Sequence, residues 1–142
     1  MARDRIYTST QYKTVVDELK EQDVLGLNIA EGKDIFMLAV ALGLENPAQL
    51  KNRVGLFLNT ALKTADRALI ASVLLGTATD DSQLDQMADF DASADLCEQC
   101  AEAGYQILQK KFNEANCDIT IFERRLIKEL ELLYTKNVLG DI

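Results

Sequence analysis

Apolar side chains recur along much of the chain at intervals of three and four residues, the spacing that places them on one face of a helix. In the first such segment the apolar positions are Tyr12, Val15, Val16 and Leu19. We therefore expect a helix over residues 9–21, with the hydroxyl of Thr8 or Ser9 capping its first turn.

A second segment is apolar almost all round. Residues 33–47 have the sequence KDIFMLAVALGLENP. A helix with apolar residues on every side is surrounded by other elements, so we expect a central helix over 31–42. Gly43 suits the left-handed position just past a helix. Pro47 prevents an easy restart, although it is able to open a short helical turn that ends at Leu50.

The middle of the chain predicts two further helices, separated by an acidic connection. The first is capped by Thr64 and ends near Gly76, with an apolar stripe of Leu69, Ile70, Val73 and Leu74. The second covers residues 92–113, with Asp91 or Ser93 as its cap. Its stripe consists of Cys97, Ala101, Gly104, Leu108 and Phe112.

Residues 51–61, before these two helices, are expected to be irregular. Within them, Gly55-Leu56-Phe57-Leu58 favours a short extended piece.

A last helix is expected over about 121–136, where Thr120 opens a capping-box sequence. Its stripe is Phe122, Leu126, Leu130 and Leu133. Ile127 and Tyr134 lie beside this stripe, so the helix carries more apolar surface than one neighbour would cover. A homodimer through this helix is one interpretation.

Together these elements predict an all-α fold: a compact single-domain bundle of about five helices spanning residues 1–142. A chain of 142 residues has the length of one domain and is able to bury a core without disulfides or metals. One Pro and no Trp, with many Ala, Leu, Glu and Lys, also favour helix over sheet.

Acidic side chains are concentrated in one part of the chain. Residues 68–109 contain no Lys or Arg, and their eight acids equal the net charge of −8: Asp80, Asp81, Asp85, Asp89, Asp91, Asp95, Glu98 and Glu102. Such a segment repels phosphate groups. Its six aspartates form a candidate acidic partner surface, including one that imitates a DNA backbone as a decoy.

Cys97 and Cys100 form a CxxC motif, a weak candidate for a redox pair or half of a metal site. A zinc site needs about four Cys or His ligands, and the chain has no His and only Cys117 besides. Acids beside the motif would raise the thiol pKa. We therefore expect the two thiols to pack in the core, with no metal and no cofactor.

Asp89–Asp95 has the alternating oxygen ligands of a calcium loop. An EF-hand needs Gly at the sixth position and Glu at the twelfth, where this chain has Ala94 and Cys100. Without His, no ordinary nucleophile–base pair is available either. The sequence therefore favours a protein that is not an enzyme.

Four basic residues flank the irregular segment: Lys51, Arg53, Lys63 and Arg67. They are candidates for contact with a phosphate backbone or an acidic partner. The charged first ten residues and the lack of an apolar run of about 18 residues predict no signal peptide and no membrane span. Three cysteines, an odd number, favour free thiols and a cytoplasmic protein.

Three stretches carry a family resemblance: KDIFMLAVALGLEN from Lys33, LKNRVGLFLNTALKTADRALIASVLL from Leu50, and AEAGYQILQ from Ala101. They resemble the small DNA-phosphorothioation-associated family of the Dnd system-associated protein 4 type, over about residues 12–111. The resemblance implies a bacterial setting of DNA sulfur modification, linked restriction and phage defence. It implies an accessory protein that docks on a larger modification or restriction subunit, and it carries over no catalytic residue.

Overall fold

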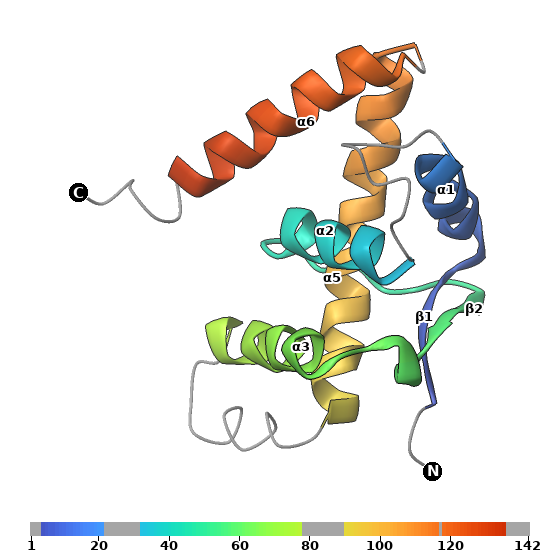
Figure 1. Ribbon diagram of the computed structural model, residues 1–142, viewed down its shortest axis with the longest axis vertical. Coiled ribbons are helices and arrows are strands. Elements are labelled where there is room, and N and C mark those ends of the chain that lie inside the picture. Colours follow the sequence, from blue (N-terminus) through green and yellow to red (C-terminus); the bar gives the residue numbers. More distant parts are fainter. Residues whose placement is uncertain (1–3, 22–31, 78–89, 117, 136–142) are drawn as a thin grey trace.

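The computed structural model describes residues 4–21, 32–77, 90–116 and 118–135, and only the backbone at 74–77 and 133. Five α-helices and a two-stranded antiparallel sheet make up the described residues (Figure 1). The elements are β1 (Arg5–Ser9), α1 (Thr10–Glu21), α2 (Gly32–Gly43), β2 (Arg53–Leu58), the 3-10 helix η2 (Asn59–Ala61), α3 (Thr64–Thr77), α5 (Phe90–Glu114) and α6 (Ile119–Tyr134). The chain is mostly helical, as expected, but its class is α+β, so the prediction of a purely all-α fold is wrong.

The strands form a ribbon in which Arg5 pairs with Leu58 and Ser9 pairs with Arg53. A β-bulge interrupts the pairing between Ile6 and Tyr7. β2 includes the extended piece expected at 55–58 and begins two residues earlier. β1 has only five residues, and its hydrogen-bond partners lie more than 40 residues away, so local sequence gives little sign of it.

α5 is the central helix of the fold. Among the described elements, α2 and α5 form the most extensive packing contact. A Cβ atom at Gly43 would collide with the carbonyl oxygen of Cys100, and one at Gly104 would collide with that of Ala39. The two backbones therefore touch. Gly43 is the last residue of α2 and is not in the left-handed region, so the role expected for it was wrong. It is needed for close approach.

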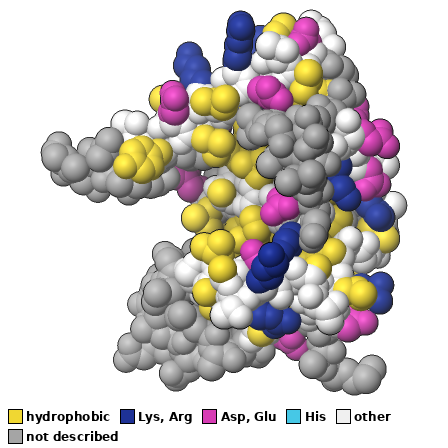
Figure 2. Space-filling model, viewed as in Figure 1, with side chains coloured by type: hydrophobic (Ala, Val, Ile, Leu, Met, Phe, Trp, Pro, Cys, Tyr) yellow, Lys and Arg dark blue, Asp and Glu magenta, His cyan; other side chains and the backbone are white. Residues whose placement is uncertain are grey.

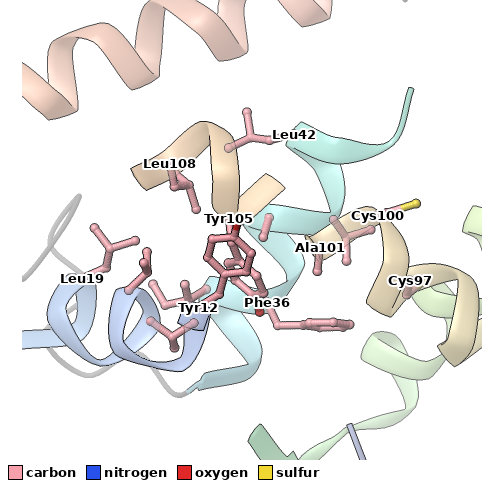
Figure 3. Close-up of a cluster of buried hydrophobic side chains, with 14 of the residues drawn as sticks. Tyr12, Leu19, Phe36, Leu42, Cys97, Cys100, Ala101, Tyr105 and Leu108 are labelled. Atoms are coloured by element: carbon pink, nitrogen blue, oxygen red, sulfur yellow. The ribbon is translucent and has the colours of Figure 1, made fainter. Parts of the chain in front are cut away.

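The core is built around this contact. α2 buries Ile35, Phe36, Ala39, Val40 and Leu42 against its neighbours, but Ala41 is exposed, so the helix is central without being covered on every side. The whole stripe predicted for α5 is buried. Tyr105, which the sequence did not single out, also lies in the core near Tyr12 of α1 (Figure 3). The centroids of these two rings are 6.0 Å apart.

Two local predictions are corrected by the structure. No helical turn follows Pro47; instead the Ala48 N–H donates to the carbonyl oxygen of Gln99 at 3.0 Å, which ties this segment to α5. Leu69, expected in the apolar stripe of its helix, is 53% exposed, whereas Ile70 is buried.

Two helix starts also differ from prediction. α3 begins at Thr64, and the Asp66 carboxylate accepts the Lys63 N–H at 2.8 Å. α6 is capped by Asp118, whose carboxylate accepts the N–H groups of Thr120 and Ile121. In both cases a carboxylate satisfies free N–H groups at the start of the helix in place of the expected threonine hydroxyl.

Replacement of Gly104 by Ala tests the contact between α2 and α5. Ala is the better helix former, so helix propensity alone predicts a gain. The clash with the Ala39 carbonyl should outweigh it and lower the free energy of unfolding by about 2 kcal/mol or more, measured by urea titration. Gly32→Ala is the control, because a Cβ there meets nothing closer than 3.7 Å. Equal stability of the two variants would contradict the close contact.

Candidate functional site

Both candidate thiols lie in the core. Cys97 and Cys100 are fully buried on α5, and Cys97 Sγ is 3.6 Å from the carbonyl oxygen of Ile70. Burial raises the pKa of the Cys97 thiol to about 12 and that of Cys100 to about 11. These thiols are protonated near neutral pH and sealed from solvent, so they pack rather than react. Among the described residues, no group of three or more His, Cys, Asp or Glu is placed to hold a metal ion.

The four basic candidates do not form one patch. Lys51 and Arg53 stand at the start of β2, whereas Lys63 and Arg67 follow its end. A six-residue strand is about 17 Å long, so the two pairs lie at opposite ends of the ribbon.

The two arginines also have aromatic neighbours. Arg53 lies over the ring of Tyr7, with its guanidinium carbon 5.9 Å from the ring centroid. Arg67 lies over Phe90 at 4.9 Å and donates to the carbonyl oxygen of Asn59 at 3.3 Å. Both side chains therefore contribute to packing around the ribbon and α3.

The candidate acidic surface is only partly described. Asp80, Asp81, Asp85 and Asp89 lie outside the described residues. Asp91 and Asp95 lie in the first turns of α5, where negative charge is favourable. The last two acids of the segment, Glu98 and Glu102, are not on the surface at all: they are 1% and 2% exposed.

Glu98 and Glu102, one helical turn apart, hold β1 against α5. Glu98 Oε2 accepts the backbone N–H of Tyr7 at 2.7 Å, and its Oε1 is 3.9 Å from a guanidinium nitrogen of Arg53. The hydroxyl of Ser9 donates to Glu102 Oε1 at 2.6 Å. It also accepts the Lys51 N–H at 2.8 Å, so Ser9 does not fill the predicted role of helix cap.

Glu102 is only half satisfied. Its Oε2 atom has no hydrogen-bond partner, and neither has the buried hydroxyl of Tyr105 or of Thr8. Desolvation raises the pKa of Glu102, although its bonds to Ser9 and the charge of Lys51 act in the opposite direction. Both carboxylates are buried too deeply for a substrate to reach them. Glu98 and Glu102 therefore have a structural role, which is to hold the ribbon on α5. Sequence analysis missed it because two acids in an acidic segment carry no sign of burial.

The described surface also has a distinctive feature at α6. This helix leaves the end of α5 and extends past α2 (Figure 1). Phe122 and Leu126 fix its first half in the core, where the Phe112 and Phe122 rings meet edge to face at 5.3 Å. In its second half, Ile127 and Tyr134 are 47% and 57% exposed, in agreement with the excess apolar surface expected there.

The second half of α6 forms one wall of what we call the apolar notch. This α6 wall borders a hollow of about 530 Å³. The residues that line it are Ile127, Leu130, Glu131, Tyr134 and Thr135. The second wall is formed by α2 and α3, which border a hollow of about 300 Å³. The residues that line it are Met37, Val40, Ala41, Leu44, Leu69, Ser72 and Val73. A third hollow, of about 310 Å³, joins the end of α2 to α5 and α6. Figure 2 shows hydrophobic side chains along the recess below α6.

Comparisons of the chain with protein-family models, with curated proteins and with solved structures gave no match. In the part of the chain that the structure describes, no helix has the length and apolar character needed to cross a membrane.

Replacement of Glu102 by Gln tests the half-satisfied carboxylate. The amide would remove a buried charge and keep an oxygen that accepts from the Ser9 hydroxyl, so we expect a gain of about 1 kcal/mol in the free energy of unfolding at neutral pH. Because the native pKa is raised, the stabilising contribution of the protonated acid is complete below the unfolded pKa near 4.5 and is lost as the pH rises through the native pKa. The gain should therefore be small below pH 4.5 and grow above it.

Glu98→Gln is the matched control, because Glu98 accepts a charge-assisted hydrogen bond from the Tyr7 N–H. The same substitution there should lower stability by about 1–2 kcal/mol. Urea titrations of both variants across this pH range measure the difference. A loss of stability in Glu102→Gln equal to that in Glu98→Gln would show that the two carboxylates are equally well satisfied.

Proposed function

We propose that the protein acts by docking rather than by catalysis, and that the apolar notch receives a helix from a larger protein partner. The observation that carries this proposal is the exposed apolar surface on α6 and on α2 and α3, beside the recess that Figure 2 shows. Leu69 on one wall and Tyr134 on the other are both more than half exposed. Clustered exposure of this kind on a folded protein marks an interaction site.

The shape of the notch favours one kind of ligand. An amphipathic helix binds in a groove by placing apolar side chains at positions i, i+3 or i+4, and i+7 into it. A polar rim borders the notch: Glu131 belongs to the α6 wall, and Glu129, which pairs with Lys111 at 3.4 Å, lines the adjoining hollow. A partner helix with a basic residue beside its apolar stripe would suit Glu131 on this rim.

The site chemistry of the described residues supports a non-catalytic role. The thiols of Cys97 and Cys100 are buried with raised pKa values, and the chain has no histidine. The carboxylates of Glu98 and Glu102 are engaged beneath the ribbon.

The biological setting of the proposal comes from the sequence. The resemblance of residues 12–111 to the DNA-phosphorothioation-associated family supports an accessory role in bacterial DNA sulfur modification and restriction, as part of phage defence. The partner would then be a modification or restriction subunit in the cytoplasm.

Two alternative functions have weaker support. Direct contact with nucleic acid would need the four basic residues to act together, and β2 separates them into two pairs. An acidic decoy would depend on the aspartates of residues 80–95, of which only Asp91 and Asp95 are described, at the start of α5.

Affinity capture from the source cells tests the proposal. The tagged protein should retain a DNA-modification or restriction subunit identified by mass spectrometry. Leu69→Glu places a charge in the notch and should lower recovery of that subunit at least about tenfold. Leu58→Glu is the control, since Leu58 is also about half exposed, at 50%, but lies on β2 away from the notch.

Equal loss of the subunit in both variants, or no such subunit with the unaltered protein, would contradict docking through the notch. A mobility-shift assay covers the main alternative. Duplex DNA binding at low salt that disappears in the double variant Lys51→Glu, Arg53→Glu would favour nucleic-acid contact instead.

A further inference from the structure

One edge of the ribbon, along β2, has no strand beside it in the part of the chain that the structure describes. The other edge is covered, because β1 lies against α5: the Tyr7 N–H donates to Glu98 at 2.7 Å and the Ser9 hydroxyl donates to Glu102. The ribbon lies on the side of α5 away from the second half of α6 (Figure 1). The edge along β2 is therefore separate from the apolar notch.

The register of the ribbon shows which backbone groups of β2 point outward. Tyr7 is opposite Gly55, and its N–H points to α5, away from β2. The two residues therefore form a non-hydrogen-bonded pair, in which the N–H and C=O of Gly55 also point away from the other strand. Because this pattern alternates along a strand, the same holds for Arg53. Neither residue forms a backbone hydrogen bond with a described group across this edge.

These two residues offer a short template for another strand. They present two N–H donors and two C=O acceptors, and Arg53 is exposed while Gly55 is partly exposed. A row of unpaired N–H and C=O groups pairs readily with an extended chain. A helix does not suit it, because the backbone groups of a helix are bonded internally. A phosphate group supplies acceptors but no donor for the two carbonyls.

Positive charge flanks this edge at both ends. Residues 51–63 contain Lys51, Arg53 and Lys63 and no acid, and Arg67 follows in the first turn of α3. All four are exposed. A strand of six residues separates them into two pairs about 17 Å apart, which is too wide for one compact anion. An extended chain rises about 3.3 Å per residue, so acids five or six residues apart would reach both pairs.

The acids near the ribbon leave this charge largely uncompensated. Asp66 accepts a hydrogen bond from the ammonium group of Lys33 at 3.1 Å, and Glu98, 3.9 Å from Arg53, is buried. No described acid forms a salt bridge with the ammonium group of Lys51 or Lys63. A ligand for this edge should therefore carry negative charge at both ends.

We propose that an extended acidic segment of a partner protein adds to the ribbon as a third strand along β2. Its backbone exchanges hydrogen bonds with Arg53 and Gly55, and acidic side chains at its two ends meet the cations that flank the strand. A third strand also stabilises a ribbon that has only two. The inference goes beyond the proposed function, because this surface is separate from the notch and neither site needs the other.

Fluorescence anisotropy with a labelled synthetic peptide tests the added strand. The probe has three aspartates at each end of four central residues, in which valine and threonine alternate. It should bind the full chain saturably at concentrations below about 1 mM. A peptide with the same charges, N-methylated at its four central residues, should bind at least about tenfold more weakly, because it lacks N–H donors for the carbonyls of β2.

Charge reversal at the two flanks tests the electrostatic part. The double variant Lys51→Glu, Lys63→Glu should weaken binding of the probe at least about tenfold. The double variant Arg124→Glu, Lys128→Glu is the matched control, because it makes the same change in net charge at exposed residues of α6. It should bind within about threefold of the unaltered protein. Leu69→Glu, in the notch, should leave binding of the probe unchanged.

Amide hydrogen exchange followed by NMR locates the added strand. In the free protein, the N–H groups of Arg53 and Gly55 should exchange faster than that of Val54, which faces β1 opposite Thr8. A saturating amount of the probe should slow exchange at Arg53 and Gly55 at least about tenfold, and by more than at Val54.

Four results would overturn the added strand. They are no saturable binding of the probe at about 1 mM, equal binding of the N-methylated peptide, equal weakening by the two double variants, and unchanged exchange at Gly55. Any of these would leave the proposed function standing, because the probe does not use the notch. Failure to capture a larger subunit through the notch would contradict the proposed function and not the added strand.

Discussion

The contact between the backbones of α2 and α5 is the constraint on which the rest of the fold depends. Gly43 and Gly104 allow it, since a side chain at either position would collide with a carbonyl oxygen of the opposite helix. Once α2 lies this close, its apolar side chains fill the space between α1, α5 and the ribbon. The two glycines give up helix propensity, and the packing gained between two long helices offsets that loss.

The same contact fixes which side of α5 is left for the ribbon. Glu98 and Glu102 lie on that side, and their carboxylates accept an N–H and a hydroxyl from β1. Burying two acids is costly, and Glu102 keeps one oxygen without a partner. The two carboxylates give the Tyr7 N–H and the Ser9 hydroxyl strong hydrogen-bond acceptors, and this holds β1 at one position along α5. The ribbon has only two strands, and a two-stranded sheet is marginally stable unless it packs against another element.

α6 shows how one helix can belong both to the core and to the surface. Phe122 and Leu126 continue the apolar stripe of the core, whereas Ile127 and Tyr134 extend the same apolar arc beyond the reach of α5. The helix is rooted firmly enough to hold its second half in a defined place. An exposed apolar surface held rigidly binds at a lower entropic cost than a mobile one, which supports the proposal that this wall of the notch docks a protein partner.

The sequence by itself determined the helices and most of the core. The three- and four-residue spacing located α1, α2, α3, α5 and α6 to within about two residues, because each helix buries a continuous stripe. It also indicated the excess apolar surface at Ile127 and Tyr134. Tertiary structure alone decided β1, whose partner strand is distant, the packing role of Gly43, the exposure of Leu69 and the burial of Glu98 and Glu102. Those features depend on which residues meet across the fold, and local periodicity records only how residues repeat along the chain.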